Sequence, residues 1–200
     1  MMLTASMDIE TLSTKTNATT LSIGICFFDD EKEQTFEEIV ATGIELFFDS
    51  DDQITKHRHV SPSTVKWWTE QGEEAQRVLS ATDVITPREF YDRLSPHIKE
   101  QGLHENWIYK HCRWFTRGPQ FDIAICDSLF DDYNVTPPWR YYNVRDIRTW
   151  LECNGLPDNT KLVKPPGMVA HNALHDAAFD AWMMQQVQHK LLDELNIDVK

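Results

Sequence analysis

The chain carries the stretch Leu3-Thr4-Ala5-Ser6-Met7-Asp8-Ile9-Glu10-Thr11 near its start, and this stretch decides how the rest of the sequence is interpreted. Apolar and polar residues alternate up to Asp8, which is typical of a β-strand. Side chains two positions apart on a strand project from the same face, so we expect Asp8 and Glu10 to point together. Two carboxylates at that distance resist joint ionisation unless a cation or a proton lies between them. The pair therefore predicts a metal site, and a strand end that runs into a polar turn is the alternative.

A second cluster of ionisable residues lies far along the chain, in the stretch His171-Asn172-Ala173-Leu174-His175-Asp176. Together with Asp8 and Glu10 it supplies carboxylates and an imidazole, which bind a divalent metal ion if folding brings the two stretches together. Asp180 follows Asp176 by about one helical turn. Four helical residues advance the chain by roughly 6 Å, so we expect only Asp176 to reach an ion held by Asp8.

The length and composition predict one globular domain over residues 1–200, because a chain of this size with 41% hydrophobic residues can bury most of its surface. No apolar run approaches the roughly 20 residues of a membrane span and no signal peptide is visible, so we expect a cytoplasmic protein. The cysteines form no Cys-x-x-Cys pair, which argues against a zinc knuckle and a disulfide framework. We expect all four to be small core residues: Cys26, Cys112, Cys126 and Cys153.

The formal net charge of −13 argues against a protein that coats duplex nucleic acid, since that mode of binding depends on broad phosphate neutralisation. The charge is unevenly distributed: acids dominate residues 29–52, whereas cations gather between residues 110 and 148. These cations predict a basic rim that guides one polyanionic strand end to an acidic site. Ordinary surface charge is the equally weighted alternative.

Turn residues and hydrophobic periodicity predict the order of strands and helices. We expect strands at 19–29 and 36–48, antiparallel neighbours of the first strand, and further strands at 107–113 and 141–144. Helices are expected from Pro62 toward Gly72, from the capping box at Thr86 to Gly102, over about 120–130, before Gly155, and over about 172–195. The loop 158–167 is predicted to be the most mobile segment. This order indicates an α/β fold with a mixed central sheet flanked by helices.

The motifs Asp8-x-Glu10, Asp122 and His171-x-x-x-x-Asp176 resemble the three exonuclease motifs of the DEDDh family of 3′-5′ exonucleases. Nearly the whole chain is similar to the phage exonuclease A type within that family, through segments that include Trp67-Trp68, Arg117-Gly118 and Asn143-Val144-Arg145-Asp146. The resemblance implies a ribonuclease-H-like fold, two divalent cations and stepwise release of nucleoside 5′-monophosphates from a free 3′ end. If the chain is phage-encoded, the resemblance places it in the host cytoplasm.

The resemblance also implies the substrate. We expect single-stranded nucleic acid with a free 3′ end, with DNA favoured and an exoribonuclease of the same family as the alternative. A non-cleaving nucleic-acid-binding module is less favoured, because inert relatives usually lose an acid and all four are present here. No membrane partner is expected, and the sequence does not determine the oligomeric state.

The resemblance assigns the metal ions to four carboxylates: Asp8, Glu10, Asp122 and Asp176. It assigns the role of general base to His171, since a histidine with a pKa near 6.5 can accept a proton at neutral pH. His175 and Asp180 repeat the five-residue spacing, but Ala173 and Ala177 complete the family pattern His-x-Ala-x-x-Asp-Ala only from His171. Oxygen ligands and turnover at a phosphate favour magnesium or manganese over zinc.

Four residues are predicted to contact the substrate: Thr11, Trp68, Arg117 and Asn172. Thr11 and Arg117 lie beside motif acids, where contact with the 3′-terminal nucleotide is expected. Trp67 and Trp68 are adjacent on a predicted helix, about 100° apart, so at most one ring can lie fully in the core. The other ring can stack a base.

Overall fold

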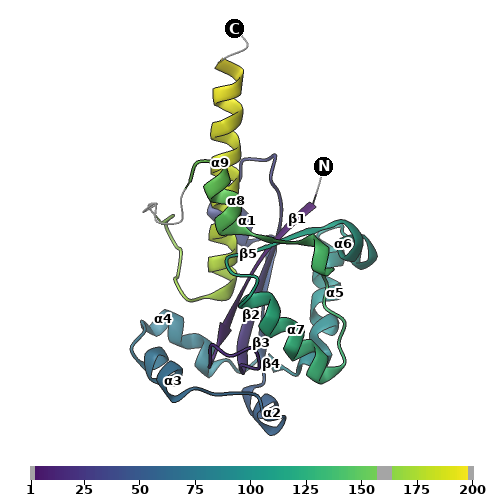
Figure 1. Cartoon of the computed structure of the whole chain (residues 1–200), viewed down its shortest axis with the longest axis vertical. Helices are drawn as coiled ribbons and strands as arrows, with labels where there is room; N and C mark the ends of the chain where they lie inside the picture. The colour runs from purple at the N-terminus through teal and green to yellow at the C-terminus, as the bar shows by residue number, and fades with distance from the viewer. Residues whose placement is uncertain (1–2, 157–163, 198–200) are drawn as a thin grey trace.

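The computed structural model describes residues 3–156 and 164–197, which contain a six-stranded sheet in the order β4-β3-β2-β1-β5-β6 (Figure 1). The strands are β1 (Leu3–Thr11), β2 (Thr20–Asp29), β3 (Gly43–Phe48), β4 (Val84–Ile85), β5 (Arg113–Thr116) and β6 (Val144–Asp146). The first three strands are antiparallel neighbours, whereas the pairs β3–β4, β1–β5 and β5–β6 are parallel. The predicted mixed sheet with three antiparallel strands is confirmed.

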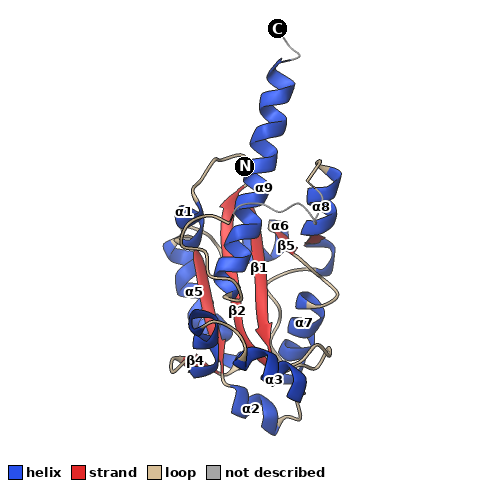
Figure 2. Ribbon diagram, turned by 90° about the vertical axis from the view of Figure 1, so that its left-hand side faces the viewer, coloured by secondary structure: helices blue, strands red, loops and turns tan. Residues whose placement is uncertain are grey.

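Helices cover both faces of this sheet (Figure 2). One face carries α5 (Phe90–Glu100), α6 (Glu105–His111) and α7 (Asp122–Tyr133), and the other carries α1 (Phe36–Val40), α8 (Ile147–Cys153) and α9 (Ala173–Ile197). The short helices α2 (Ser50–Thr55), α3 (Pro62–Thr69) and α4 (Glu73–Gln76) gather near the end of β1 in Figure 1, and Figure 2 shows α2 and α3 there as well. Within the described ranges, no helix has the length and apolar character needed to cross a membrane.

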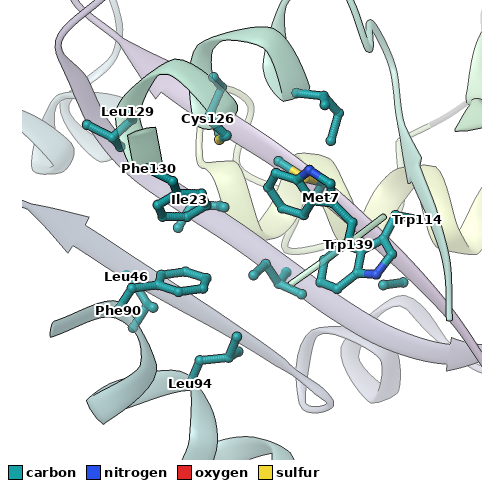
Figure 3. Close-up of a cluster of buried hydrophobic side chains, with 14 of the residues drawn as sticks. Met7, Ile23, Leu46, Phe90, Leu94, Trp114, Cys126, Leu129, Phe130 and Trp139 are labelled. Atoms are coloured by element: carbon teal, nitrogen blue, oxygen red, sulfur yellow. The ribbon is translucent and has the colours of Figure 1, made fainter. Parts of the chain in front are cut away.

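The alternation of side chains along β1 separates two hydrophobic clusters. Ala5, Met7 and Ile9 point toward α5 and α7 and join the larger cluster. Figure 3 shows this cluster, in which the rings of Trp114 and Trp139 meet edge to face with centroids 5.3 Å apart. The intervening residues of β1, which include Asp8 and Glu10, therefore face α9 on the opposite side of the sheet.

Three predicted strands are wrong in whole or in part. Residues 36–40 form α1, because the Thr35 hydroxyl accepts the Glu38 N–H while the Glu38 carboxylate accepts the Thr35 N–H, and the strand begins only at Gly43. Residues 105–111 form α6, which buries Ile108 against the core, and β5 follows at residue 113. Residues 141–143 form a 3₁₀ turn before β6. In each case a short apolar segment has no periodicity that separates a helix from a strand.

Most other predicted boundaries agree with the structure. Ser61 caps α3 through the Thr64 N–H, and Thr86 forms the predicted capping box with Glu89. α5 ends just before Gly102, whose φ of 70° is left-handed. The cysteine prediction is wrong for Cys153, which is exposed, while the other three cysteines are buried. Residues 158–163 of the predicted mobile loop lie outside the described residues.

Candidate active site

Asp8 and Glu10 lie near the carboxyl end of β1, on the face covered by α9. The Glu10 residue is only 9% exposed. In the register with β2, Asp8 lies opposite Gly24 and Glu10 lies opposite Ser22. These neighbours have small side chains, which leaves space above the two acids for another element.

The element that occupies this space is the amino-terminal end of α9. A Cβ atom built on Gly24 would lie 2.2 Å from the backbone of Ala173, and one on Gly43 would lie 2.4 Å from the Leu174 side chain. The glycines thus allow the first turn of α9 to approach β2 and β3 closely. Asp176 lies in that first turn. This approach is what brings the third predicted metal ligand to Asp8 and Glu10.

Asp122 comes from the other side of the site, at the first residue of α7. It is 4% exposed, and its Oδ2 atom accepts hydrogen bonds from the Thr116 hydroxyl and from the Gly118 N–H at 3.2 Å. Thr116 is the last residue of β5, which runs parallel to β1. The parallel pairing places the ends of both strands, and therefore both acids, at the same edge of the sheet.

The acids of the site have raised pKa values. Burial raises the pKa of Asp8 well above its usual value, and the charges of Asp122 and Glu10 raise it further. Burial, followed by the charges of Asp176 and Glu45, raises the pKa of Glu10 to about 8. Burial also raises the pKa values of Asp122 and Asp176 to about 6. Buried carboxylates that repel one another in this way are suited to a cation, which would favour their ionised form.

His171 lies directly over two of these acids. Its imidazole, Glu10 and Asp176 each offer one ligand atom, and the three atoms lie within 4.8 Å of one another. The ring also meets the Trp67 ring edge to face, with centroids 4.9 Å apart. Burial, together with the charge of Lys164, lowers the pKa of His171 from its usual value. A neutral imidazole is therefore favoured at this position.

His175 has a different environment. Its Nδ1 atom accepts the backbone N–H of Val169 at 3.0 Å, and its ring lies edge to face against Phe36. Asp180 is buried in an ion pair with Arg117, whose Nε atom donates to Asp180 Oδ1 at 3.0 Å. The structure thus brings His171 and Asp176 to the other acids, and it gives His175 and Asp180 contacts within the protein.

The predicted substrate contacts need correction at the tryptophan pair. Trp68 is 1% exposed, and its indole N–H donates to the Thr11 carbonyl at 2.9 Å. This burial argues against a substrate contact for Trp68, and Trp67, at 38% exposure, is the ring that faces outward. Thr11 itself is buried, and its hydroxyl donates to the Ser13 carbonyl. The Thr11 side chain is therefore engaged within the turn that follows β1.

Two other predicted contacts are engaged within the protein. Arg117 lines the cavity but holds Asp180, and the Asn172 amide donates to Glu45 and accepts the His175 N–H. Glu45 was missed by the sequence reasoning. The sequence pattern that could have identified Glu45 is a lone acid inside the apolar strand Gly43–Phe48. In the structure, the Glu45 carboxylate faces the same side of the sheet as Ser22 and accepts a hydrogen bond from the Ser22 hydroxyl.

The site residues line a cavity of about 740 Å³. Its wall contains all four predicted metal ligands and His171, with Arg117, Arg148 and Lys164 as cationic members and Phe121, Phe179 and Met183 among the apolar ones. A second hollow of about 330 Å³ adjoins it, lined by Glu10, Trp67 and Phe121 among others. Acids at the centre with cations on the wall are the arrangement expected for ions and a phosphate group together.

Comparison with protein families and curated proteins gives two similarities. Residues 4–188 match the family model described as the 3′-5′ exoribonuclease Rv2179c-like domain. The exodeoxyribonuclease of Enterobacteria phage T4 is 29% identical over 204 aligned positions, which cover 90% of this chain and 86% of that protein. The match spans every predicted site residue, from Asp8 to Asp176.

Solved nuclease structures share the fold. Cell-death related nuclease 4 superposes with a TM-score of 0.59 at 14% identity, over 94% of this chain and 64% of its own length. Pop2p of S. pombe, in a form with bound Mg²⁺ and Mn²⁺, gives 0.58 at 16% identity over 95% and 84% of the two chains. The nuclease domain of 3′hExo, a DEDDh family member bound to rAMP, gives 0.53 at 11% identity over 94% and 92%. The predicted ribonuclease-H-like fold is confirmed.

Proposed function

Because the chain belongs to the Rv2179c-like 3′-5′ exoribonuclease domain family, we propose that it releases nucleoside 5′-monophosphates from the free 3′ end of single-stranded nucleic acid with two divalent cations and a histidine base. It is a 3′-5′ exonuclease of the DEDDh type, and its substrate is nucleic acid. The ions, the base and the preference for one nucleic acid are the proposed parts of this function.

The single observation that carries the proposal is the convergence of four buried carboxylates and an imidazole on one cavity. Asp8, Glu10, Asp122 and Asp176 would hold magnesium or manganese, because hard divalent cations prefer oxygen ligands. Glu10, Asp176 and His171 each offer one atom, and these three atoms lie within 4.8 Å of one another, so the proposed base lies beside two of the proposed ligands.

When bound, the ions would supply charge stabilisation to the attacking and leaving oxygens of the phosphodiester. One imidazole nitrogen of His171 accepts the proton of the attacking water, and the lowered pKa keeps that imidazole neutral and ready to accept it. Arg148 and Lys164 on the cavity wall orient the substrate phosphates by charge. The Trp67 ring beside His171 offers a surface on which the terminal base can stack.

DNA is the proposed substrate, supported by the 29% identity to an exodeoxyribonuclease over most of both chains. The family description, which names an exoribonuclease, makes RNA the second candidate. The test follows the shortening of 5′-labelled DNA and RNA strands of one sequence, with magnesium, manganese or chelator, and identifies the released mononucleotides by chromatography. We expect the labelled strand to shorten stepwise from its 3′ end and only with metal. A higher kcat/KM on RNA would reverse the proposed preference.

The requirement for an end is tested with a circular single strand, which should persist while its linear form is degraded. Asp176→Asn should lower kcat by orders of magnitude, because it removes a metal ligand. Asp127→Asn is the control, since Asp127 is an acid on α7 that accepts a hydrogen bond from the Trp139 indole and is not among the residues that line the cavity. Rapid cutting of the circle, or wild-type turnover by Asp176→Asn, would contradict the proposed function.

A further inference from the structure

The loop that carries His171 has an uncommon backbone conformation. His171 has a φ of 60°, in the left-handed region that side chains with a Cβ atom rarely adopt. Such a backbone persists only where the surrounding structure holds it in place. The contacts that hold this loop therefore also determine where the His171 imidazole lies.

Hydrogen bonds hold three residues of the loop. The His171 N–H donates to Asp176 Oδ2 at 2.8 Å, and the Val169 N–H donates to His175 Nδ1 at 3.0 Å. The Asn172 Nδ2 atom donates to Glu45 Oε2 at 2.8 Å, and its Oδ1 atom accepts the His175 N–H at 2.9 Å. Two side chains outside the metal-binding set, Glu45 and His175, thus provide fixed acceptors on either side of His171.

Each of these acceptors is itself fixed. Glu45 lies in the middle of β3, and its Oε1 atom accepts the Ser22 hydroxyl at 3.1 Å. Ser22 lies opposite Glu10 in the β1–β2 register, so the loop is tied to the strand pair that carries Glu10. The His175 ring packs edge to face on Phe36 of α1, with centroids 5.6 Å apart. Both supports therefore lie on regular elements, β3 and α9, rather than on the loop itself.

We propose that Glu45 and His175 are positioning residues for the exonuclease reaction, which hold residues 169–172 so that the His171 imidazole stays over Glu10 and Asp176. This inference rests on the proposed role of His171 as general base. Neither residue contacts the reacting atoms; each acts through a hydrogen bond to the loop. The arrangement gives the acid of β3 and the second histidine a role that the motif spacing does not assign.

The test uses two variants at each position. His175→Leu and Glu45→Ala remove an acceptor, whereas His175→Asn and Glu45→Gln keep an oxygen near the same place. A misplacement of about 1 Å in a catalytic group can cost on the order of 100-fold in rate. We therefore expect the first pair to lower kcat about 10- to 100-fold with little change in KM, and the second pair to recover most of that loss.

Controls separate positioning from general damage. His97→Leu removes a histidine contact to the Thr42 carbonyl on the other face of the sheet and should leave kcat unchanged. The melting point in chelator and its rise with manganese, measured for every variant, report the fold and the ion site. A variant whose melting point did not rise with manganese would have a damaged ion site. Such a result would count against a role that acts through His171.

A double-mutant cycle gives the decisive result. If His175 acts through His171, His175→Leu should change kcat by less than about 2-fold once His171 is already alanine, because coupled residues are not additive. The same holds for Glu45→Ala. The inference would be overturned if the losses in kcat were fully additive in both cycles, or if both acceptor-removing variants kept the wild-type kcat. Either result would leave the proposed function standing. Wild-type kcat for His171→Ala would instead overturn the proposed base, and the inference with it.

Discussion

Trp67 and Trp68 are neighbours in the sequence, but their environments are opposite. Trp68 is buried near the end of β1 and donates its N–H to the Thr11 carbonyl, while Trp67 faces outward beside His171. The helical angle between adjacent residues predicted that one ring would be exposed. It could not predict which ring, because that choice depends on where α3 crosses the end of β1, and this crossing is a tertiary contact.

The two rings should therefore respond differently to truncation. Trp68→Ala removes a fully buried ring and should lower the free energy of unfolding by about 3 to 5 kcal/mol. Trp67→Ala should lower it by about 1 kcal/mol or less and should raise the KM for an oligonucleotide, because a stacking surface is lost. Urea unfolding and steady-state kinetics on both variants check this. A larger loss of stability for Trp67→Ala would contradict these environments.

The proposed metal-binding residues could be predicted from the sequence to a greater extent than the residues that support the site. Asp8, Glu10, Asp122 and Asp176 line one cavity, as their motif spacing indicated. Glu45 supports the His171 loop from β3, a strand far away in the sequence, so no local pattern relates the two. The chemistry of a site follows from its reacting groups, while its supports follow from the fold.

At the scale of elements, the site depends on how closely α9 approaches β2. Gly24 lies in the middle of β2, and a glycine inside a strand often marks a close backbone approach. The sequence contained that signal, but it did not identify α9 as the approaching element. Length and lack of breakers predicted α9 itself, whereas the short helices α1 and α6 could not be separated from strands.

Gly24→Ala should displace the first turn of α9, because the new Cβ would lie 2.2 Å from the Ala173 backbone. Backbone cannot yield as a flexible side chain does, so Asp176 should move away from Asp8. We expect a lower melting point and a loss of kcat of at least 10-fold. Gly72→Ala is the matched control, since a Cβ there meets no atom within 4 Å. Wild-type activity for Gly24→Ala would show that α9 does not need this approach.

At the scale of the whole molecule, the metal-free protein should be less stable at high pH. An unfolded acid loses its proton near pH 4, whereas Glu10 in the folded protein keeps its proton up to a pKa of about 8. Between these values the folded state binds more protons than the unfolded state. The free energy of unfolding should therefore fall as the pH rises through this window. Thermal unfolding in chelator at several pH values tests the sign.

Manganese should reverse this trend, because the ion binds the ionised carboxylates of the native state. At about 100 times the dissociation constant, one ion contributes roughly 2.7 kcal/mol. At roughly 2 to 4 °C per kcal/mol for a domain of this size, the melting point should rise by several degrees. Asp8→Ala should show a smaller rise. A rise equal to that of the wild type would mean that Asp8 takes no part in the ion site.

The position of Asp176 on α9 also matters while the protein is being made. The acids of β1 and α7 leave the ribosome first, and synthesis proceeds toward the carboxyl terminus. Until α9 has emerged and packed on Gly24, the nascent chain holds Asp8, Glu10 and Asp122 without their fourth partner. A translation product that stops before α9 therefore lacks one of the four proposed ion ligands, and we expect it to release no mononucleotides from a labelled strand.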